Sequence, residues 1–164
     1  MSDEPVTVTE LEAARADWVS EHIAGYIATR GAEGHVVDFT PIGGHSFSTT
    51  LLIRTIGRKS GAARITALTY GSIDGKVIVI ASKGGADINP AWYLNLQGHE
   101  SVDIQIGGQA FRATWEEAQG ERAADLWAFM TRVYPPYADY QAGTSRRIPL
   151  LVLSPGEAIA PFES

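Results

Sequence analysis

A β-hairpin is indicated by residues 102–115, which read VDIQIGGQAFRATW. On its first arm apolar residues alternate with Asp103 and Gln105, and on its second arm they alternate with Arg112 and Thr114. Successive side chains of a strand point to opposite faces, so this period of two predicts strands with one buried and one exposed face. The two glycines between the arms predict the tight turn that joins them. The stretch therefore predicts antiparallel sheet.

Further strand patterns lie on both sides of this hairpin. We predict four more strands, at Phe47–Thr55, Arg64–Tyr70, Val77–Ala81 and Arg147–Leu153. Val77–Ala81 is apolar throughout, which is typical of a strand buried on both faces. Pro149 has no N–H to donate, so it predicts an edge or a bulge in the last strand. With the hairpin, the sequence predicts six short strands.

Helical patterns flank the strands without alternating with them. We predict helices at Thr9–Arg30, which Gly31 ends, at Asn89–Leu96 and at Glu116–Val133. The lack of alternation disfavours a parallel doubly wound sheet. The predicted fold is mainly β with flanking helices, as a closed or split antiparallel barrel. At this length we expect residues 1–164 to form one domain.

Charge and composition exclude several classes of function. The chain has 164 residues, a net charge of −6 and no cysteine, which argues against general nucleic-acid binding and excludes thiol chemistry. Its four histidines show no metal-ligand spacing, so we expect no metal site. The first residues lack the basic and apolar regions of a signal peptide. We therefore expect a cytoplasmic protein.

The most basic segment is the turn Gly57–Gly61. With Arg54 before it and Arg64 after it, this segment holds four of the thirteen basic residues. Guanidinium groups and exposed loop amides together suit a phosphate or a carboxylate. A solvated hairpin turn with scattered cations explains the same residues. Both readings stay open on spacing alone.

Three further segments suggest a pocket. Ser82–Gly85 follows a buried strand and offers a hydroxyl, a charge and accessible amides. Trp92, within Asn89–Asn95, could cover one face of a planar ring. Tyr134–Tyr140 places three tyrosines in a stretch that we predict to be a proline-stiffened loop, acting as a lid. A plain turn, a core tryptophan and a loop that covers the core are the simpler alternatives.

Together these segments resemble the deazaflavin-dependent nitroreductase family, also described as deazaflavin-dependent quinone reductases. The similar stretches are Gly57–Gly61 with Arg64, Ser82–Gly85, Asn89–Leu96, and Tyr134–Gln141 with Thr144, Arg146, Ile148 and Pro149. The resemblance covers roughly residues 51–155. The sequence departs from the family pattern at Ile56, where threonine is common, and over Phe39–Ser46.

The resemblance implies a flavin-reductase-like split barrel, of the kind that binds flavin mononucleotide (FMN), and the deazaflavin coenzyme F-420 as hydride carrier. The tail of that coenzyme is anionic, and the residues expected to hold it are Arg58, Lys59, Ser60 and Arg64. The residues expected to hold its ring are Ile80, Ala81, Ser82, Lys83, Ala91, Trp92, Tyr93, Leu94 and Asn95. Ser82, Tyr134 and Tyr140 are the expected catalytic residues on the acceptor side, where Tyr137 also contacts the cofactor.

The expected function is hydride transfer to a small organic acceptor, which is a quinone, a nitro compound or an activated double bond. An FMN-dependent reductase and a non-catalytic deazaflavin carrier remain alternatives. The acidic N-terminal segment predicts weak or absent membrane contact, and a peripheral position at the inner face of the membrane stays open. A homodimer stays open as well, because barrels of this size often pair edges.

Overall fold

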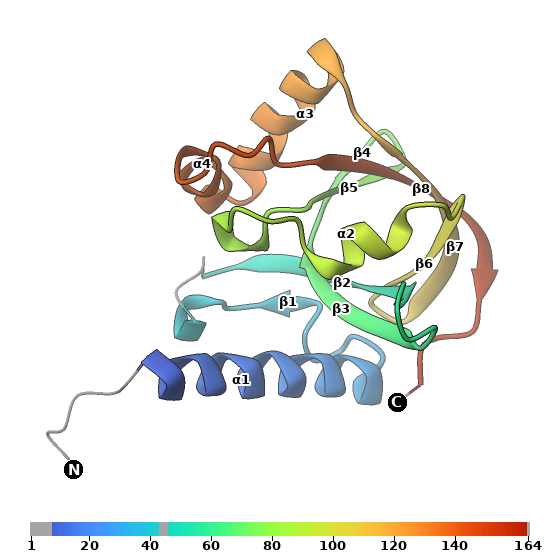
Figure 1. Ribbon diagram of the computed structural model, residues 1–164. Helices are drawn as coiled ribbons and strands as arrows, with labels where there is room; N and C mark the ends of the chain where they lie inside the picture. The colour runs from blue at the N-terminus through green and yellow to red at the C-terminus, as the bar shows by residue number, and fades with distance from the viewer. Residues whose placement is uncertain (1–7, 43–45, 164) are drawn as a thin grey trace, which may run out of the picture.

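The computed structural model describes residues 8–42 and 46–163, with side chains from Ala16 onward (Figure 1). Its helices are α1 (Val8–Thr29), α2 (Ala91–Leu96), α3 (Gly120–Val133) and α4 (Pro136–Ala142), with the short 3-10 turns η1 (Thr40–Ile42) and η2 (Lys83–Gly85). Its strands are β1 (Val36–Val37), β2 (Ser48–Ile56), β3 (Ala63–Thr69), β4 (Gly71–Ile73), β5 (Lys76–Ile80), β6 (Ser101–Ile106), β7 (Gln109–Glu117) and β8 (Leu150–Ile159).

The strands form one antiparallel sheet of eight strands. Their order is β1-β2-β6-β7-β8-β5-β4, and β3 pairs with β2 outside this path. The sheet curls into a half-barrel, with α1 along one side of it and α3 and α4 on another (Figure 1). The predicted antiparallel barrel with flanking helices is therefore confirmed.

The predicted hairpin is confirmed and lies in the middle of the sheet. Its arms are β6 and β7, which pair Val102 with Ala113 and Ile104 with Phe111. β6 also pairs with β2, and β7 also pairs with β8. Val102 and Ile104 of β6 are buried because they pack in the core cluster that also contains Leu51.

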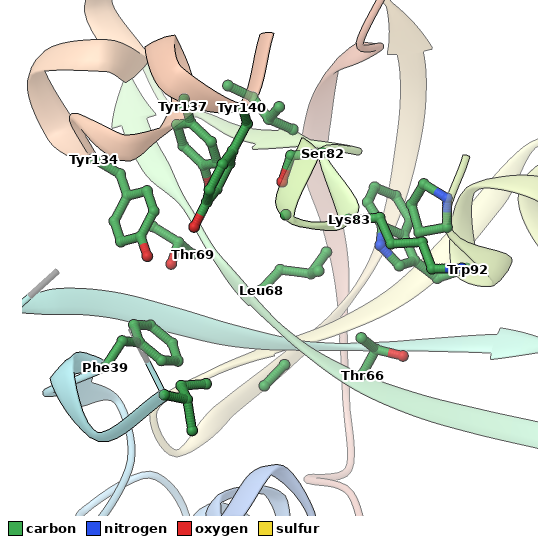
Figure 2. Close-up of a pocket in the computed structure, with 15 residues that line it drawn as sticks. Phe39, Thr66, Leu68, Thr69, Ser82, Lys83, Trp92, Tyr134, Tyr137 and Tyr140 are labelled. Carbon is green, nitrogen blue, oxygen red and sulfur yellow. The ribbon is translucent and has the colours of Figure 1, made fainter. Parts of the chain in front are cut away.

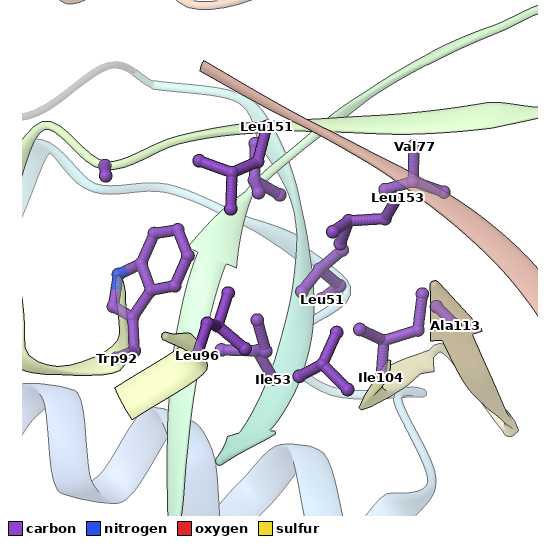
Figure 3. Packing of buried hydrophobic residues seen from close by; sticks show 12 residues of the cluster. Leu51, Ile53, Val77, Trp92, Leu96, Ile104, Ala113, Leu151 and Leu153 are labelled. Carbon is purple, nitrogen blue, oxygen red and sulfur yellow. The ribbon is translucent and has the colours of Figure 1, made fainter. Parts of the chain in front are cut away.

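β5 is buried on both faces, as its unbroken apolar sequence predicts. Val77 and Val79 point into the barrel, where they join the cluster that contains Trp92 (Figure 3). Ile78 and Ile80 point the other way, into the cluster under α3 and α4. The alternation of side chains along a strand thus links the barrel interior to the helical layer.

Two predictions are wrong, namely the start of a helix at Glu116 and the loop at Tyr134–Tyr140. Pairing with a distant strand decides the first, and the position of a proline decides the second. Glu116 and Glu117 belong to β7, not to a helix, since they pair with Val152 and Leu151 of β8. The segment Tyr134–Tyr140 is largely the helix α4, not a loop. Proline suits the first turn of a helix because its fixed φ is helical and the missing N–H has no helical partner there.

The other differences lie at the ends of the sheet. The last strand begins at Leu150 rather than Arg147, and it continues to Ile159 through Pro155. Pro149 precedes this strand, and its carbonyl accepts from the Ala81 N–H at 2.9 Å. β1 and β4 hold only two and three residues, too few for a periodic signal, so the sheet has eight strands instead of six.

α1 is tied to the barrel at the end of the helix. It stops at Arg30 and Gly31, which both have positive φ, and the predicted stop at Gly31 is confirmed. A Cβ on Gly31 would lie 2.4 Å from the Cα of Gly107 in the β6–β7 turn. Because Gly31 has no Cβ, the helix end can touch this turn. The Tyr26 hydroxyl accepts from the Gly107 N–H at 2.8 Å.

The last described residues of the chain pack against α1. Phe162 is buried in a cluster with Tyr26 of α1 and Leu52 of β2. The Phe162 N–H donates to Gln105 Oε1 at 2.6 Å, and the Arg54 guanidinium lies 4.3 Å from the centre of the Phe162 ring. This contact joins residues from both ends of the described chain.

Across residues 8–42 and 46–163, no helix is both long enough and apolar enough to cross a membrane. A single domain over residues 1–164, a homodimer and a peripheral membrane position stay predictions. Thr9 and Glu12 have the spacing of a capping box for the first helix, and their side chains lie outside the described ones.

Candidate active site

Two pockets adjoin at Thr66 of β3 and Trp92 of α2, which line both. The aromatic pocket, of about 330 Å³, is lined by Phe39, Ile42, Thr66, Ala67, Leu68, Thr69, Ile80, Ser82, Lys83, Gly84, Pro90, Trp92, Tyr134, Tyr137 and Tyr140. The basic pocket, of about 540 Å³, is lined by Thr55, Gly57, Arg58, Lys59, Ser60, Ala63, Arg64, Ile65, Thr66, Ala91, Trp92 and Asn95. Together they form one elongated site.

The basic pocket is built on the β2–β3 turn. Gly61 has a φ of +71°, and its N–H donates to the Gly57 carbonyl at 2.8 Å, which closes the turn. Arg58 and Lys59 on this turn and Arg64 on β3 bring three cations to the pocket, and its lining contains no carboxylate. In a chain with a net charge of −6, this is a local region of positive potential suited to an anion.

Asn95 fixes the arginine of this turn. Its Oδ1 accepts from both the backbone N–H and the Nη1 of Arg58, each at 3.2 Å. Its Nδ2 donates to Thr55 Oγ1, also at 3.2 Å, and both Asn95 and Thr55 are buried. Asn95 therefore positions Arg58, and the guanidinium keeps further N–H groups for a ligand.

The aromatic pocket has the tyrosines and the η2 turn beside one another, with β3 across from them (Figure 2). The ring centres of Tyr134 and Tyr137 lie 4.9 Å apart, and that of Tyr140 lies 6.1 Å from Tyr137. The Phe39 ring centre lies 6.3 Å from that of Tyr134 and adds a fourth aromatic ring to the lining. The pocket is therefore rich in aromatic side chains.

The hydroxyls of Tyr137 and Tyr140 stay protonated. Burial raises the pKa of Tyr137 and of Tyr140 well above the usual 10.0 for tyrosine. For Tyr140 the hydrogen bond with Tyr134 raises the pKa further. A buried phenolate is disfavoured because it loses its hydration. These groups are therefore neutral hydrogen-bond donors throughout the physiological pH range.

The open edge of β3 forms the floor of the aromatic pocket. The Tyr70 N–H donates to the Thr49 carbonyl at 3.1 Å, and such hydrogen-bonded pairs recur at every second residue. The backbone groups of Leu68 therefore face β2, and those of Ala67 and Thr69 face away from it. In the described part of the chain β3 pairs with β2 alone, so this edge offers donors and acceptors to a flat polar ring.

Residues 18–155 match the profile of a family described as F420H(2)-dependent quinone reductase. The chain belongs to this family. Its members are oxidoreductases whose cofactor is coenzyme F-420, as the resemblance implied. The quinone reductase part of that resemblance is confirmed.

Individual relatives agree with this assignment. An F420H(2)-dependent quinone reductase of Mycobacterium tuberculosis is 35% identical over 136 residues, which cover 81% of this chain and 87% of the relative. A solved structure of an F420-H2 dependent reductase is 36% identical with a TM-score of 0.59, over 64% of this chain and 93% of that one. A second solved structure, described only as a domain-swapped dimer, is 31% identical with a TM-score of 0.62, over 85% of this chain and 99% of that one.

The paired pockets fit the cofactor of the F420H(2)-dependent quinone reductases. A flat ring suits the aromatic side chains and open strand edge of the aromatic pocket, and an anionic tail suits the three cations of the basic pocket. Thr66 and Trp92 belong to both pockets, so one elongated molecule could reach both. The shape and the charge of the site thus agree with the family assignment.

Most of the residues predicted for the site come together in these pockets. The structure brings Arg58, Lys59, Ser60, Arg64, Ala91 and Asn95 to the basic pocket, Ile80, Ser82, Lys83, Tyr134, Tyr137 and Tyr140 to the aromatic pocket, and Trp92 to both. Three predicted residues lie elsewhere. Ala81 is buried in the barrel core, and Tyr93 and Leu94 lie off the α2 face that carries Ala91, Trp92 and Asn95. The Tyr93 hydroxyl donates to Glu117 instead.

Several residues that line the aromatic pocket were not predicted from the sequence. Phe39 and Ile42 lie in a glycine-rich connector that reads as a linker, although they form part of the pocket wall. Thr66 and Leu68 read as ordinary strand residues, because only the topology leaves β3 with an open edge. The pattern Phe-x-x-Ile before a strand is too short to predict a pocket.

Proposed function

We propose that this chain transfers a hydride from reduced coenzyme F-420 to a quinone, or to a nitro compound or activated double bond of similar size. The observation that carries the proposal is the junction of the two pockets at Thr66 and Trp92. It lets one molecule place an anionic tail among cations and a flat ring beside tyrosine hydroxyls. When bound, the reduced cofactor supplies the hydride.

The residues divide by their chemistry. Arg58, Lys59 and Arg64 would bind the anions of the tail through charge-assisted hydrogen bonds, and the Ser60 hydroxyl would add a neutral one. Ser82, Lys83 and Trp92 would hold the ring over the β3 edge. Much of the rate enhancement would then come from orientation and from exclusion of water.

On the acceptor side the neutral tyrosines would act as donors. A quinone that takes up a hydride gains two electrons and becomes an anion at its carbonyl oxygen, and one proton completes the quinol. Tyr140, whose hydroxyl points into the pocket (Figure 2), would donate a hydrogen bond to that oxygen. Tyr134 and Ser82 line the same pocket and could hold the proton that follows.

A direct assay tests the proposal. Reduced coenzyme F-420 is mixed with the purified protein and menadione, a nitroaromatic or an enone, and its oxidation is followed by absorbance. We expect oxidation that depends on the protein with at least one quinone. Tight binding without oxidation of the cofactor by any acceptor would indicate a carrier. A yellow protein that prefers FMN would indicate the flavin-dependent alternative.

Replacing Tyr140 by phenylalanine should lower kcat about 10-fold while the Kd for the cofactor changes less than about 2-fold, because one hydrogen bond to developing charge is lost. Since the pKa of Tyr140 is raised, its phenol keeps its proton up to and beyond pH 10. The wild-type kcat should therefore show no loss from ionisation of Tyr140 below that pH.

The matched control is Tyr70→Phe, which removes a hydroxyl outside both pockets, where it contacts His35 at 2.7 Å. Its kcat should equal the wild-type value. Equal kcat values in wild type and Tyr140→Phe would leave Tyr140 with a packing role only.

A further inference from the structure

The Arg146 guanidinium donates hydrogen bonds to four oxygen atoms. Its Nε donates to the Ala86 carbonyl at 2.9 Å, and its Nη2 donates to the Ser82 carbonyl at 2.8 Å. Its Nη1 donates to Asn89 Oδ1 at 2.7 Å and to the Ala81 carbonyl at 3.2 Å. All four acceptors lie within residues 81–89, the segment that carries one wall of the aromatic pocket. They are carbonyl and amide oxygens rather than carboxylates.

That segment has little structure of its own. Lys83, Gly84 and Gly85 all have positive φ, of +47°, +63° and +85°, and the left-handed region is costly for lysine. Two local backbone hydrogen bonds hold the turn, from Gly85 to Ser82 at 3.0 Å and from Ala86 to Lys83 at 3.2 Å. The turn therefore depends on contacts from elsewhere to keep its conformation.

Arg146 is itself anchored to α4, the helix that carries Tyr137 and Tyr140. Gln141 of α4 donates from Nε2 to the Arg146 carbonyl at 2.7 Å, and Gln141 Oε1 accepts from the Ile148 N–H at 3.1 Å. The turn and the helix also touch directly, since a Cβ on Gly85 would lie 3.0 Å from the Cα of Tyr140. Arg146 thus links the turn that carries Ser82 to the helix that carries Tyr140.

We propose that Arg146 is a positioning residue, whose guanidinium fixes the η2 turn against α4 and so sets the position of Ser82 relative to Tyr140 in the aromatic pocket. Arg146 lines neither pocket, so it acts through these two residues. The role rests on the proposed hydride transfer, because the positions of Ser82 and Tyr140 matter for the rate only if reactants lie beside them.

The chemistry of the side chain favours this role. A planar guanidinium presents five N–H groups in fixed directions and can satisfy several carbonyls at once, whereas an ammonium group is a single point with rotating donors. Lysine at this position should therefore keep the charge and lose most of the geometry. Misplacement of reactants by about 1 Å can cost on the order of 100-fold in rate.

The test compares Arg146→Met and Arg146→Lys with Arg147→Met. Arg147 is the exposed neighbour and lies outside both pockets, so its variant is a control for loss of the same side-chain type. Hydrogen exchange reports on residues 82–89 without cofactor, and steady-state kinetics with reduced coenzyme F-420 and menadione report on the reaction. The thermal midpoint reports on the whole fold.

In Arg146→Met we expect exchange at residues 82–89 to rise about 10-fold or more while β5 and β8 keep their protection. We expect kcat to fall about 10- to 100-fold, with less than about 3-fold change in the cofactor Kd, because the tail contacts remain. Arg146→Lys should resemble Arg146→Met in both readouts, and Arg147→Met should resemble wild type.

Unchanged exchange at residues 82–89 in Arg146→Met would overturn the positioning role, whatever the kinetics show. Increased exchange across the whole sheet in both Arg146 variants would also overturn it, since the role would then be general stability. A wild-type protein that oxidises no cofactor would instead overturn the proposed function, and the exchange data would still show whether Arg146 holds the turn.

Discussion

Replacing Arg58 and Lys59 together by alanine is expected to weaken binding of coenzyme F-420 by roughly 2–4 kcal/mol, which is about 30- to 1,000-fold in Kd. Each removed cation takes away a charge-assisted hydrogen bond to the tail. Arg58 is also held in place by Asn95, so little ordering entropy is lost when it binds. Calorimetric or fluorescence titration of the oxidised cofactor measures the effect.

The matched control is the double variant Lys76→Ala, Arg132→Ala, which removes the same charge from exposed positions outside both pockets. Its Kd should lie within about 2-fold of the wild-type value at physiological salt, because distant surface charges are screened. Equal weakening in both double variants would mean that net charge, rather than the basic pocket, attracts the cofactor. No weakening in either would remove the tail assignment.

Replacing Gly31 by alanine should lower the free energy of unfolding by about 2–5 kcal/mol. Two costs add here. The residue has a φ of +83°, where an L side chain is strained, and the new Cβ would meet the Gly107 backbone at 2.4 Å. Backbone atoms cannot rotate away as a side-chain tip can, so α1 or the β6–β7 turn must move. Denaturant unfolding followed by circular dichroism measures the loss.

Gly75→Ala separates these two costs. Gly75 has a similar φ of +74° in the β4–β5 turn, but nothing lies within 4 Å of the Cβ it would gain. It should lose only about 1 kcal/mol, the conformational part. Equal losses at both positions would show that the contact between α1 and the hairpin turn adds nothing to stability.

The sequence was sufficient for features that are written in local periodicity. The β6–β7 hairpin and the doubly buried β5 follow from spacing alone, and the glycines around Arg58 and Lys59 indicated a turn with cations. The basic pocket was therefore predictable as a cluster of positive charge. The role of Asn95 in holding Arg58 was not predictable from the local pattern, because that contact joins residues 37 positions apart.

Features that depend on long-range pairing were not predictable in this way. Glu116 and Glu117 have helical preferences, but their pairing with β8 makes them strand residues. Tyr134–Tyr140 reads as a loop because of its prolines, yet Pro136 begins a helix. The open edge of β3 and the placing of Phe39 against Tyr134 exist only once the sheet has curled.

The contact of Phe162 with Tyr26 has a consequence for the order of events during biosynthesis. Tyr26 emerges from the ribosome well before Phe162, and its cluster under α1 cannot be complete until Phe162 has emerged as well. Until then Gln105 lacks its backbone donor and Tyr26 lacks one of its buried neighbours. A nascent chain of this protein thus carries an incomplete apolar cluster under α1 until Phe162 is made, and chaperones act on such exposed apolar surface.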